Sequence, residues 1–371
     1  MITRIFFPVG QGAFYAEKHE KFNMVYDCGN RWKTKKSQEV VRQSFTKDDI
    51  INILFISHLD YDHISLIKTL KDTVKSIERV VMPLLSSEQK ILISATYGMD
   101  DADIYHMVND PKVFFGNETK FTYIEQSGVK EFNPDDNPIF YDDLSARIAS
   151  GTKIKMGNNS ANYNWCFIPF NIENKTRSKE LECKLKKAGL NVSELKTDSL
   201  NTLRKLIDTK SKNKIKKIYE SLNGDINENS LVIYSGPYDI SRKYAILNYD
   251  LDHETLFRYL VSCEHYLEFP CDRVACVFTG DVDLNEFDIT KVFGSYWNAV
   301  GTVQIPHHGS LHSFKPDFLK SKIMYCPVSF GTENNYGHPS YNVISEIIKE
   351  MSYVIKVTEK MDSGYVQYIN I

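Results

Sequence analysis

Short apolar runs separated by polar turns dominate the chain, and their lengths favour strands over long helices. Four such runs predict strands at 2–9, 22–29, 51–57 and 77–85. Apolar residues at helical spacing predict a helix over 64–74. This alternation indicates an α/β domain with right-handed crossovers and a site at the carboxyl end of a strand.

The strand pattern returns in the second half of the chain. Further strands are predicted at 231–237, 243–249, 273–281, 301–310, 323–331, 353–358 and 365–371, with a helix over 342–351. No linker rich in Gly, Pro or Ser separates the two halves. We therefore expect a single domain over residues 1–371.

A basic segment at about residues 173–224 interrupts this alternation of strands and helices. From Glu173 to Lys217 there are 14 Lys and Arg residues against 6 Asp and Glu residues, a local net charge of +8. Apolar residues from Leu195 to Leu222 recur at roughly helical intervals, which predicts an inserted helical segment. Its lysines form either a solvated surface or a patch for a nucleic-acid backbone.

Overall charge and hydropathy limit which nucleic-acid and membrane partners the sequence predicts. The net charge of −3 excludes a general basic field that would attract nucleic acid or membrane, so a polyanion must be bound by local charge or by metal. No apolar run approaches the ~18 residues of a membrane span, and the first residues lack the pattern of a signal peptide. We expect a cytoplasmic protein with no membrane partner. The seven scattered cysteines form no Cys-x-x-Cys pair and are predicted to be reduced.

Four potential metal ligands follow the predicted strand at 51–57. They are His58, Asp60, Asp62 and His63. Imidazole nitrogens suit zinc, while two carboxylates favour manganese or magnesium. A loop that directs alternate side chains to two positions could serve two ions. The alternative is a polar loop in which Asp62 caps the following helix.

More potential ligands occur where later predicted strands end. Asp281 ends the strand at 273–281, His307 and His308 follow an apolar run, and His338 lies in a polar loop after another. Five of the ten histidines thus occupy junctions between an apolar strand and a polar loop. This clustering favours a shared metal site over scattered structural histidines.

Six ordered motifs resemble the metallo-β-lactamase superfamily, and most closely the hydrolase domain of ComEC-type competence proteins and their stand-alone relatives. The motifs are Val9-Gly10-Gln11-Gly12, Asp27-Cys28-Gly29, Ser57 to His63, Thr279-Gly280-Asp281, Pro306 to Ser310, and Asn334 to Pro339. The resemblance implies an αββα sandwich with two divalent metal ions, zinc or manganese, at its edge.

The resemblance also implies roles for individual residues. His58 and Asp60 would hold one ion, Asp62, His63 and His308 the other, and Asp281 would bridge them. Asp62 and His338 are the predicted catalytic residues, and Asp27 would orient a ligand. The predicted substrate-binding residues are His307, Ser310, Asn335 and His338.

The chain departs from the family pattern at several positions. Ala13 stands where the family usually has Asp, and Ser65-Leu66 replace two glycines. The metal-binding His that most of the superfamily places before the bridging Asp is missing; ComEC-type members have Asn-x-Ser-Leu-Val there, approximated here by Asn229-Ser230-Leu231-Val232. The first ion would therefore have the poorer set of ligands, and occupancy by a single metal is a possible outcome.

These features predict a metal-dependent hydrolase, first of all a phosphodiesterase or nuclease that cleaves DNA, or RNA, by metal-activated water. Its expected partner is nucleic acid or another phosphodiester. Two alternatives remain open: a hydrolase of a small ester, lactam or cyclic nucleotide, and a non-catalytic nucleic-acid-binding or interaction module. The sequence shows no P-loop, no dinucleotide-binding fingerprint and no Gly-x-Ser-x-Gly elbow.

Overall fold

The structure of the protein is a computed structural model. It describes residues 1–85, 89–90, 93–94, 101–126, 137–156, 163–173, 183–184, 186–187, 229–247, 272–320 and 322–370. Of the predicted insertion at 173–224, only residue 173 and helical residues at 183–184 and 186–187 fall within these ranges. The rest of that prediction lies outside the described residues.

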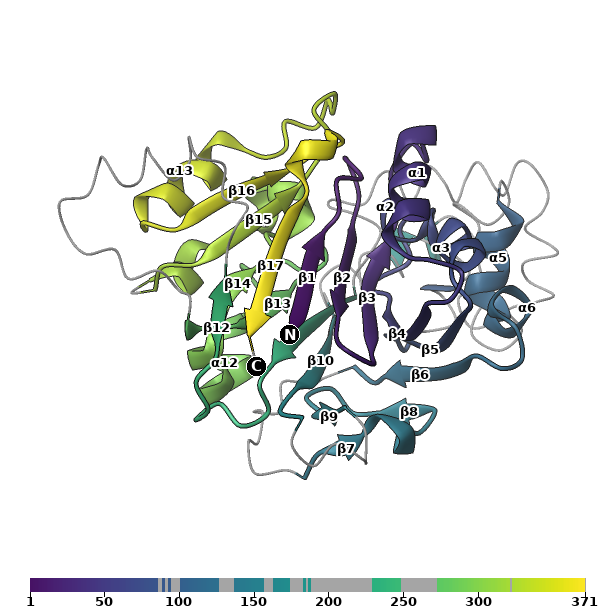
Figure 1. The fold of residues 1–371 in the computed structure, drawn as a ribbon. Coiled ribbons are helices and arrows are strands. Elements are labelled where there is room, and N and C mark those ends of the chain that lie inside the picture. Colours follow the sequence, from purple (N-terminus) through teal and green to yellow (C-terminus); the bar gives the residue numbers. More distant parts are fainter. Residues whose placement is uncertain are drawn as a thin grey trace.

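One of two mixed sheets contains, among the described residues, nine strands in the order β12-β17-β1-β2-β3-β4-β5-β6-β8 (Figure 1). Strands β3 to β6 are parallel to one another, and β17, β1, β2 and β3 pair antiparallel. The bounds are β1 Ile2–Phe6, β2 Phe14–Lys18, β3 Asn23–Cys28, β4 Ile50–Phe55, β5 Ser76–Pro83, β6 Lys120–Ile124, β8 Arg147–Ile148, β12 Ala245–Leu247 and β17 Tyr365–Asn370.

The other sheet contains eight described strands in the order β16-β15-β14-β13-β11-β10-β9-β7. Strands β13 to β16 are parallel, whereas β9, β10, β11 and β13 pair antiparallel. The bounds are β7 Ile139–Phe140, β9 Ile154–Lys155, β10 Cys166–Glu173, β11 Asn229–Gly236, β13 Ala275–Phe278, β14 Val300–Val303, β15 Tyr325–Ser329 and β16 Tyr353–Val357.

Helices cover the outer face of each sheet. Over the first sheet lie α1 Lys35–Ser44, α2 Tyr61–Ile64, α3 Ile67–Thr73, α5 Ala102–Asn109 and α6 Pro111–Phe115. Over the second lie α12 Ile289–Phe293 and α13 Tyr341–Lys349, with the short 3-10 turn η7 Pro316–Leu319. Other 3-10 turns are η2 Tyr141–Asp143, η4 Gly294–Ala299, η5 His307–Gly309, η6 Leu311–Ser313 and η8 Met361–Ser363. Within the described chain, no helix is both long and apolar enough to span a bilayer.

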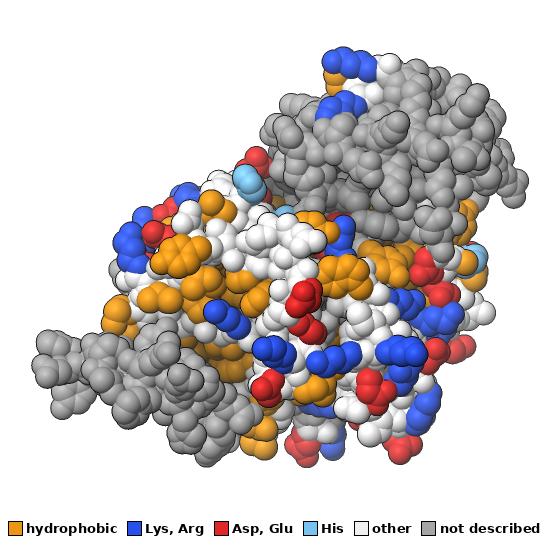
Figure 2. All heavy atoms as spheres, turned by 90° about the horizontal axis from the view of Figure 1, so that it is seen from above, with side chains coloured by type: hydrophobic (Ala, Val, Ile, Leu, Met, Phe, Trp, Pro, Cys, Tyr) orange, Lys and Arg blue, Asp and Glu red, His pale blue; other side chains and the backbone are white. Residues whose placement is uncertain are grey.

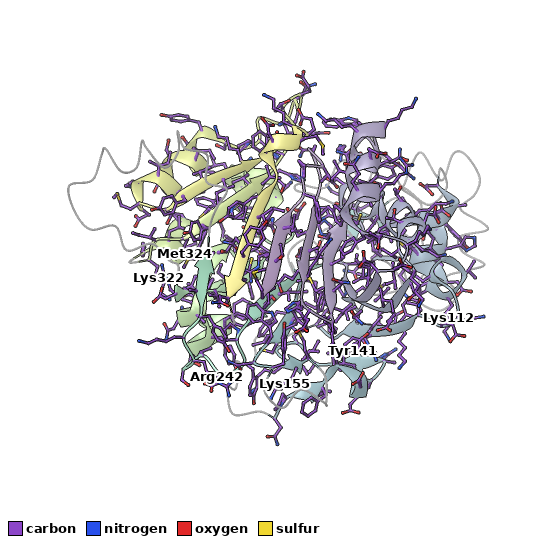
Figure 3. All side chains as sticks on the ribbon, viewed as in Figure 1. Lys112, Tyr141, Lys155, Arg242, Lys322 and Met324 are labelled. Carbon is purple, nitrogen blue, oxygen red and sulfur yellow. The ribbon has the colours of Figure 1, made fainter. Side chains whose placement is uncertain are left out.

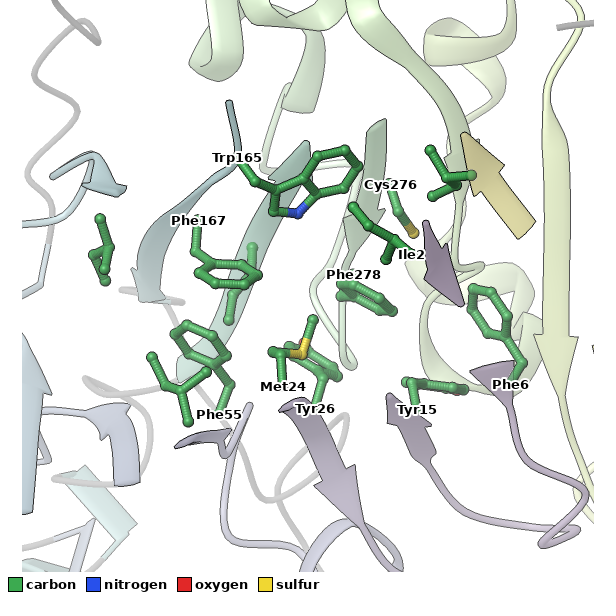
Figure 4. Close-up of a cluster of buried hydrophobic side chains, with 14 of the residues drawn as sticks. Ile2, Phe6, Tyr15, Met24, Tyr26, Phe55, Trp165, Phe167, Cys276 and Phe278 are labelled. Atoms are coloured by element: carbon green, nitrogen blue, oxygen red, sulfur yellow. The ribbon is translucent and has the colours of Figure 1, made fainter. Parts of the chain in front are cut away.

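The central core lies between the two sheets and is rich in aromatic rings. Phe6, Tyr15, Tyr26 and Phe278 contact one another across it, with ring centroids 5.0 to 6.1 Å apart (Figure 4). Each such buried apolar side chain stabilises the fold by roughly 1.5–3 kcal/mol relative to its exposed state. Side chains fill the space between the sheets, whereas Lys112 and Arg242 project from the rim (Figure 3).

These four layers confirm the predicted αββα sandwich. The predicted helix at 64–74 is divided, because α2 ends at Ile64 and α3 begins at Ile67. At the division, the Ser65 hydroxyl accepts a hydrogen bond from Asn30 N at 3.0 Å and donates one to Asn30 O at 2.8 Å. Ser65 thus joins this loop to the one after β3.

The carboxyl ends of the parallel strands in both sheets lie along one edge of the sandwich, at the top of Figure 1. Loops after β3, β4, β13, β14 and β15 meet there. The predicted site residues lie in or beside these loops, which is where strand ends of an α/β fold place functional side chains.

Candidate metal centre

The loop after β4 is held close to two glycines. A Cβ on Gly29 would lie 2.4 Å from Asp62 C, and one on Gly12 would lie 2.8 Å from Asp62 O. No side chain fits at either position, so the Val-Gly-Gln-Gly and Asp-x-Gly motifs allow this loop to pack against the first sheet. Ala13 is buried, and its N–H donates to Asp62 O at 3.1 Å.

Five of the six predicted ligands form two overlapping triads. His58, His63 and Asp281 make one, and Asp62, His63 and His308 make the other, with candidate donor atoms in each triad within 4.8 Å of one another. His308 Nε2 lies 3.2 Å from Asp62 Oδ2, and His63 Nε2 lies 3.2 Å from Asp281 Oδ1. Two ligands of one tetrahedral zinc ion are about 3.3 Å apart, so these separations suit shared ions.

The two oxygens of Asp281 face different histidines. Its Oδ1 lies 3.2 Å from His63 Nε2, and its Oδ2 lies 3.6 Å from His58 Nε2. Asp60, the sixth predicted ligand, stands on the His58 side, with Oδ2 3.9 Å from His58 Nε2. Asp281 therefore lies between the His58–Asp60 pair and the triad of Asp62, His63 and His308.

Each of the three ligand histidines is held through its Nδ1 atom. His63 Nδ1 donates to Asp27 Oδ2 at 2.8 Å, and His308 Nδ1 donates to Ser329 O at 2.8 Å. His58 Nδ1 lies 2.7 Å from Ser57 Oγ. A proton on Nδ1 leaves Nε2 as the lone-pair nitrogen, and every one of these Nε2 atoms faces a carboxylate of the centre.

Asp27 organises two of these histidines. It is fully buried and has a positive φ of 55°, a conformation that non-glycine residues rarely adopt outside functional sites. Its Oδ2 also accepts from the Ser57 hydroxyl at 2.6 Å, and its Oδ1 accepts from Ser57 N at 2.7 Å. Because the Ser57 proton goes to Asp27, Ser57 Oγ is left to accept from His58 Nδ1.

Asp62 does not cap a helix. It lies inside α2, whose N-cap residue is Asp60, and its Oδ2 lies 3.2 Å from His308 Nε2. Asp60 makes no capping hydrogen bond through its side chain either. The alternative of a polar loop with a helix cap is therefore wrong for these two carboxylates, which face the histidine cluster.

The shifted pKa values of Asp281 and His63 show that this cluster stabilises a positive charge next to its carboxylates. Burial alone would raise the pKa of Asp281, but His63, His307 and His58 lower it well below its usual value. Burial alone would lower the pKa of His63, but the carboxylates of Asp281 and Asp27 raise it well above its usual value. A divalent cation would supply the same positive charge at this point.

The donor set fits a divalent metal. Three imidazole nitrogens and three carboxylates converge here, and His63 Nε2 is buried without a hydrogen bond, although Asp281 lies nearby. Nitrogen and oxygen donors of this kind suit zinc or manganese. The predicted ligands are thus brought together, and their assignment to particular ions remains a proposal.

The predicted substrate side lies next to this cluster. His307 and His308 both have positive φ, 50° and 54°. Their rings have different partners, because His307 Nδ1 bonds Ser313 Oγ at 3.0 Å and His308 Nδ1 bonds Ser329. The ring of His307 lies 5.3 Å from that of His338. Ser310 is buried in the same turn, while Asn335 is exposed at the tip of the loop after β15.

The side chain of Asn334 holds that loop together. Its amide donates to Gly331 O at 2.6 Å and to His338 O at 2.7 Å, and its oxygen accepts from the N–H groups of Tyr336 and His338. Asn334 is the first residue of the Asn-x-Tyr-Gly-His-Pro motif, which marked the residue but not this role.

Other supporting residues were not singled out from the sequence. Gln304 Oε1 accepts from Thr279 N at 2.8 Å and Gly280 N at 3.0 Å, which fixes the turn before Asp281. Ser230 Oγ accepts from Asp281 N at 3.2 Å. A buried polar residue at the end of an apolar strand, as Gln304 is, was the available signal.

Comparisons with known proteins give structural likeness alone. No protein-family model and no curated protein matches the chain. The metallo-β-lactamase fold protein YhfI from Bacillus subtilis is 8% identical with a TM-score of 0.40, covering 100% of both chains. Zn²⁺-bound PqqB from Methylobacterium extorquens is 7% identical with a TM-score of 0.41, covering 96% of this chain and 98% of its own.

The short form of human tRNase Z is 10% identical with a TM-score of 0.36, covering 96% of this chain and 92% of its own. Identities and TM-scores at this level leave the function of this chain to be argued from its own site. The predicted resemblance to ComEC-type domains rests on the six sequence motifs alone, and the comparisons do not support it.

Proposed function

We propose that this protein is a binuclear metal-dependent phosphodiesterase that cleaves nucleic acid, DNA before RNA. The observation that carries the proposal is the position of Asp281, whose two oxygens face His63 at 3.2 Å and His58 at 3.6 Å. A carboxylate placed in this way between two groups of donors suits a bridge between two ions.

In this proposal His58 and Asp60 hold one ion, Asp62, His63 and His308 hold the other, and Asp281 contacts both. Two bound divalent ions would supply an activated water nucleophile and a clamp for the reacting phosphate oxygens. The role of the chain is to hold the six donors rigidly. Asp27, Ser57 and Ser329 do so by engaging the Nδ1 atoms of the histidines.

A phosphodiester substrate is supported by the groups beside the centre. His307 and His338 lie with their rings 5.3 Å apart next to the ligand cluster, where either could donate a hydrogen bond to a phosphate oxygen. The three carboxylates among the ligands favour hard metal ions, which phosphoryl oxygens also bind. The +8 charge of residues 173–217 offers a sequence-based argument for a nucleic-acid backbone.

The test combines metal analysis with cleavage of labelled single- and double-stranded DNA and of RNA, with Mn²⁺ and Zn²⁺ supplied. We expect close to two metal ions per chain and cleavage that falls at least 100-fold in Asp62→Asn. Asp72→Asn, which changes an exposed aspartate on α3, is the matched control and should cleave like the wild type. Absence of cleavage of any nucleic acid would overturn the proposal.

The two alternatives correspond to distinct results of the same test. Bound metal with hydrolysis of a cyclic nucleotide, ester or lactam, but not of DNA or RNA, would indicate the small-substrate hydrolase. Nucleic-acid binding without bound metal would indicate the non-catalytic module. The intact set of six donors argues against the module, because loss of catalysis removes the need to maintain ligands.

A further inference from the structure

Two loops meet beside the candidate metal centre and carry exposed aromatic side chains. Trp32, in the loop after β3, is 50% exposed, and Tyr336, in the loop after β15, is 51% exposed. The loops are joined by Gln11, whose Oε1 accepts from Gly331 N at 3.0 Å and whose carbonyl accepts from Arg31 N at 2.7 Å. Trp32 packs against Gly331, since its Cζ3 lies 3.1 Å from where a Cβ on that glycine would be.

Tyr336 is held firmly although its side chain is half exposed. Its N–H donates to Asn334 Oδ1 at 3.1 Å, and its ring lies 5.2 Å from the Arg31 guanidinium carbon. Thr332, in the same loop, is hydrogen-bonded to Glu359 through both its N–H and its hydroxyl. We call Arg31, Trp32 and Tyr336 the mouth platform. Its two rings lie on two loops that these contacts hold in place, so they lose little freedom on binding a flat ligand.

A chain of rings leads from the platform to the ligand cluster. The Tyr336 ring lies 6.0 Å from that of His338, which lies 5.3 Å from His307. His307 in turn lies 6.3 Å from the ring of His308, one of the proposed metal ligands. A strand that runs outward from a phosphate at the centre along these rings would therefore pass His307 and His338 before it meets Tyr336.

We infer that the mouth platform stacks a nucleobase of the strand whose phosphate is held at the centre, which makes single-stranded nucleic acid or an unpaired strand end the preferred substrate. This inference rests on the proposed function. Bases inside a duplex have both faces covered by their neighbours, so only an unstacked base can lie on Tyr336 or Trp32. Arg31 places a cation over one face of the Tyr336 ring, so a base would stack on the other face while the cation attracts its phosphate.

The charge pattern of this face also favours stacking. Figure 2 looks onto the edge of the sandwich that carries the site, and its Lys and Arg side chains are mixed with Asp and Glu. The chain as a whole has a net charge of −3. The described part of this edge therefore offers no single basic field for the backbone, and ring contacts are the recognition that it does offer.

The experiment compares two single-stranded DNA substrates of equal length, one with ordinary bases and one with abasic tetrahydrofuran nucleotides. The wild type should cleave the base-bearing strand with a kcat/KM roughly 5- to 150-fold higher, the range that one stacked base provides. Tyr336→Leu should abolish most of this preference by raising KM for the base-bearing strand, and Tyr336→Phe should retain it. Tyr341→Leu, at the exposed start of α13, is the matched control and should behave like the wild type.

A binding measurement separates this inference from the proposed function. The probe is a phosphorothioate-linked single strand containing 2-aminopurine, whose fluorescence is quenched when the base stacks. Quenching that is lost in Tyr336→Leu would support the platform even if the wild type cleaved no nucleic acid. Equal cleavage of the base-bearing and abasic strands, or quenching unchanged in both Tyr336→Leu and Trp32→Leu, would overturn the inference while leaving a phosphodiesterase in place.

Discussion

The His63 ring is bonded to the buried carboxylate of Asp27, with 2.8 Å between Nδ1 and Oδ2. This bond sets the tautomer of His63 and directs its other nitrogen towards Asp281. Through the Ser57 hydroxyl, the same carboxylate also positions His58. One buried aspartate thus orients a histidine on each side of Asp281, which makes it the main support of the proposed ligand set.

Asp27→Asn should weaken metal binding without removing the site. The amide cannot accept from His63 Nδ1 as strongly as a carboxylate, and loss of such a contact typically lowers metal affinity 10–100-fold. Asparagine tolerates the positive φ of 55° at this position, so the backbone should be preserved. Competition with a chelator measures the affinity, and excess metal should restore full occupancy. An unchanged metal dissociation constant would show that Asp27 serves packing alone.

Asp281→Asn should have the larger effect, because the neutral amide offers one oxygen where the carboxylate offers two. We expect metal content to fall from about two ions per chain to one or fewer, with hydrolysis reduced at least 100-fold. Elemental analysis and a cleavage assay on the same preparation measure both effects. Asp283→Asn, two residues further along in an exposed turn, is the control and should keep both metal and activity. Full metal content in Asp281→Asn would contradict the bridging position.

The apolar runs, which are short and separated by turn residues, predicted an α/β domain, and the resemblance carried by the six motifs implied the two-sheet sandwich. The sequence also located the ligand candidates, since histidines and aspartates that recur directly after several buried strands must converge at one edge of the sheets. It did not reveal that Gln304 and Ser230 hold the turn around Asp281, because single polar residues at strand ends have many possible roles. It also did not reveal that the Asn334 side chain holds the loop after β15, because a hydrogen bond to a carbonyl within the same loop leaves no pattern in the sequence.

Gly29→Ala should disturb the centre through its backbone. The new Cβ would lie 2.4 Å from Asp62 C and 2.5 Å from His63 C, which forces the ligand loop away from β3. Overpacking of this kind typically costs about 1–3 kcal/mol. Urea unfolding of the metal-free protein measures the loss of stability, and metal analysis should show reduced content. Gly364→Ala, whose Cβ would have its nearest contact at 3.3 Å, should change neither quantity by much; equal effects of the two variants would contradict the close-approach argument.

The buried ion pair of Arg4 and Glu17, which lies outside the ligand cluster, should make a large contribution to the stability of the fold against acid. Glu17 Oε1 accepts from Arg4 Nε at 2.7 Å, and its other oxygen accepts from Ser235 Oγ at 2.5 Å and Trp165 Nε1 at 3.3 Å. The other titratable groups around this pair include His19, Tyr163, Tyr234, Cys276 and Tyr365. Burial alone would raise the pKa of Glu17, but Arg4 and His19 lower it to about 2 from the ordinary 4.5.

Because that pKa is depressed in the folded state, the ionised carboxylate stabilises the fold above pH 4.5, and this contribution is lost as pH falls towards 2. Glu17→Gln leaves Arg4 buried without its counter-charge, so we expect the free energy of unfolding to fall by about 3–5 kcal/mol at pH 7. The deficit relative to the wild type should narrow as pH falls from 4.5 towards 2, because the unfolded wild-type chain takes up a proton on Glu17 in this range while the folded state keeps the charge. Urea unfolding at several pH values measures it, with the exposed Glu39→Gln expected to cost at most about 1 kcal/mol. A deficit that stayed constant from pH 7 to pH 3 would show that the Glu17 charge does not govern acid stability.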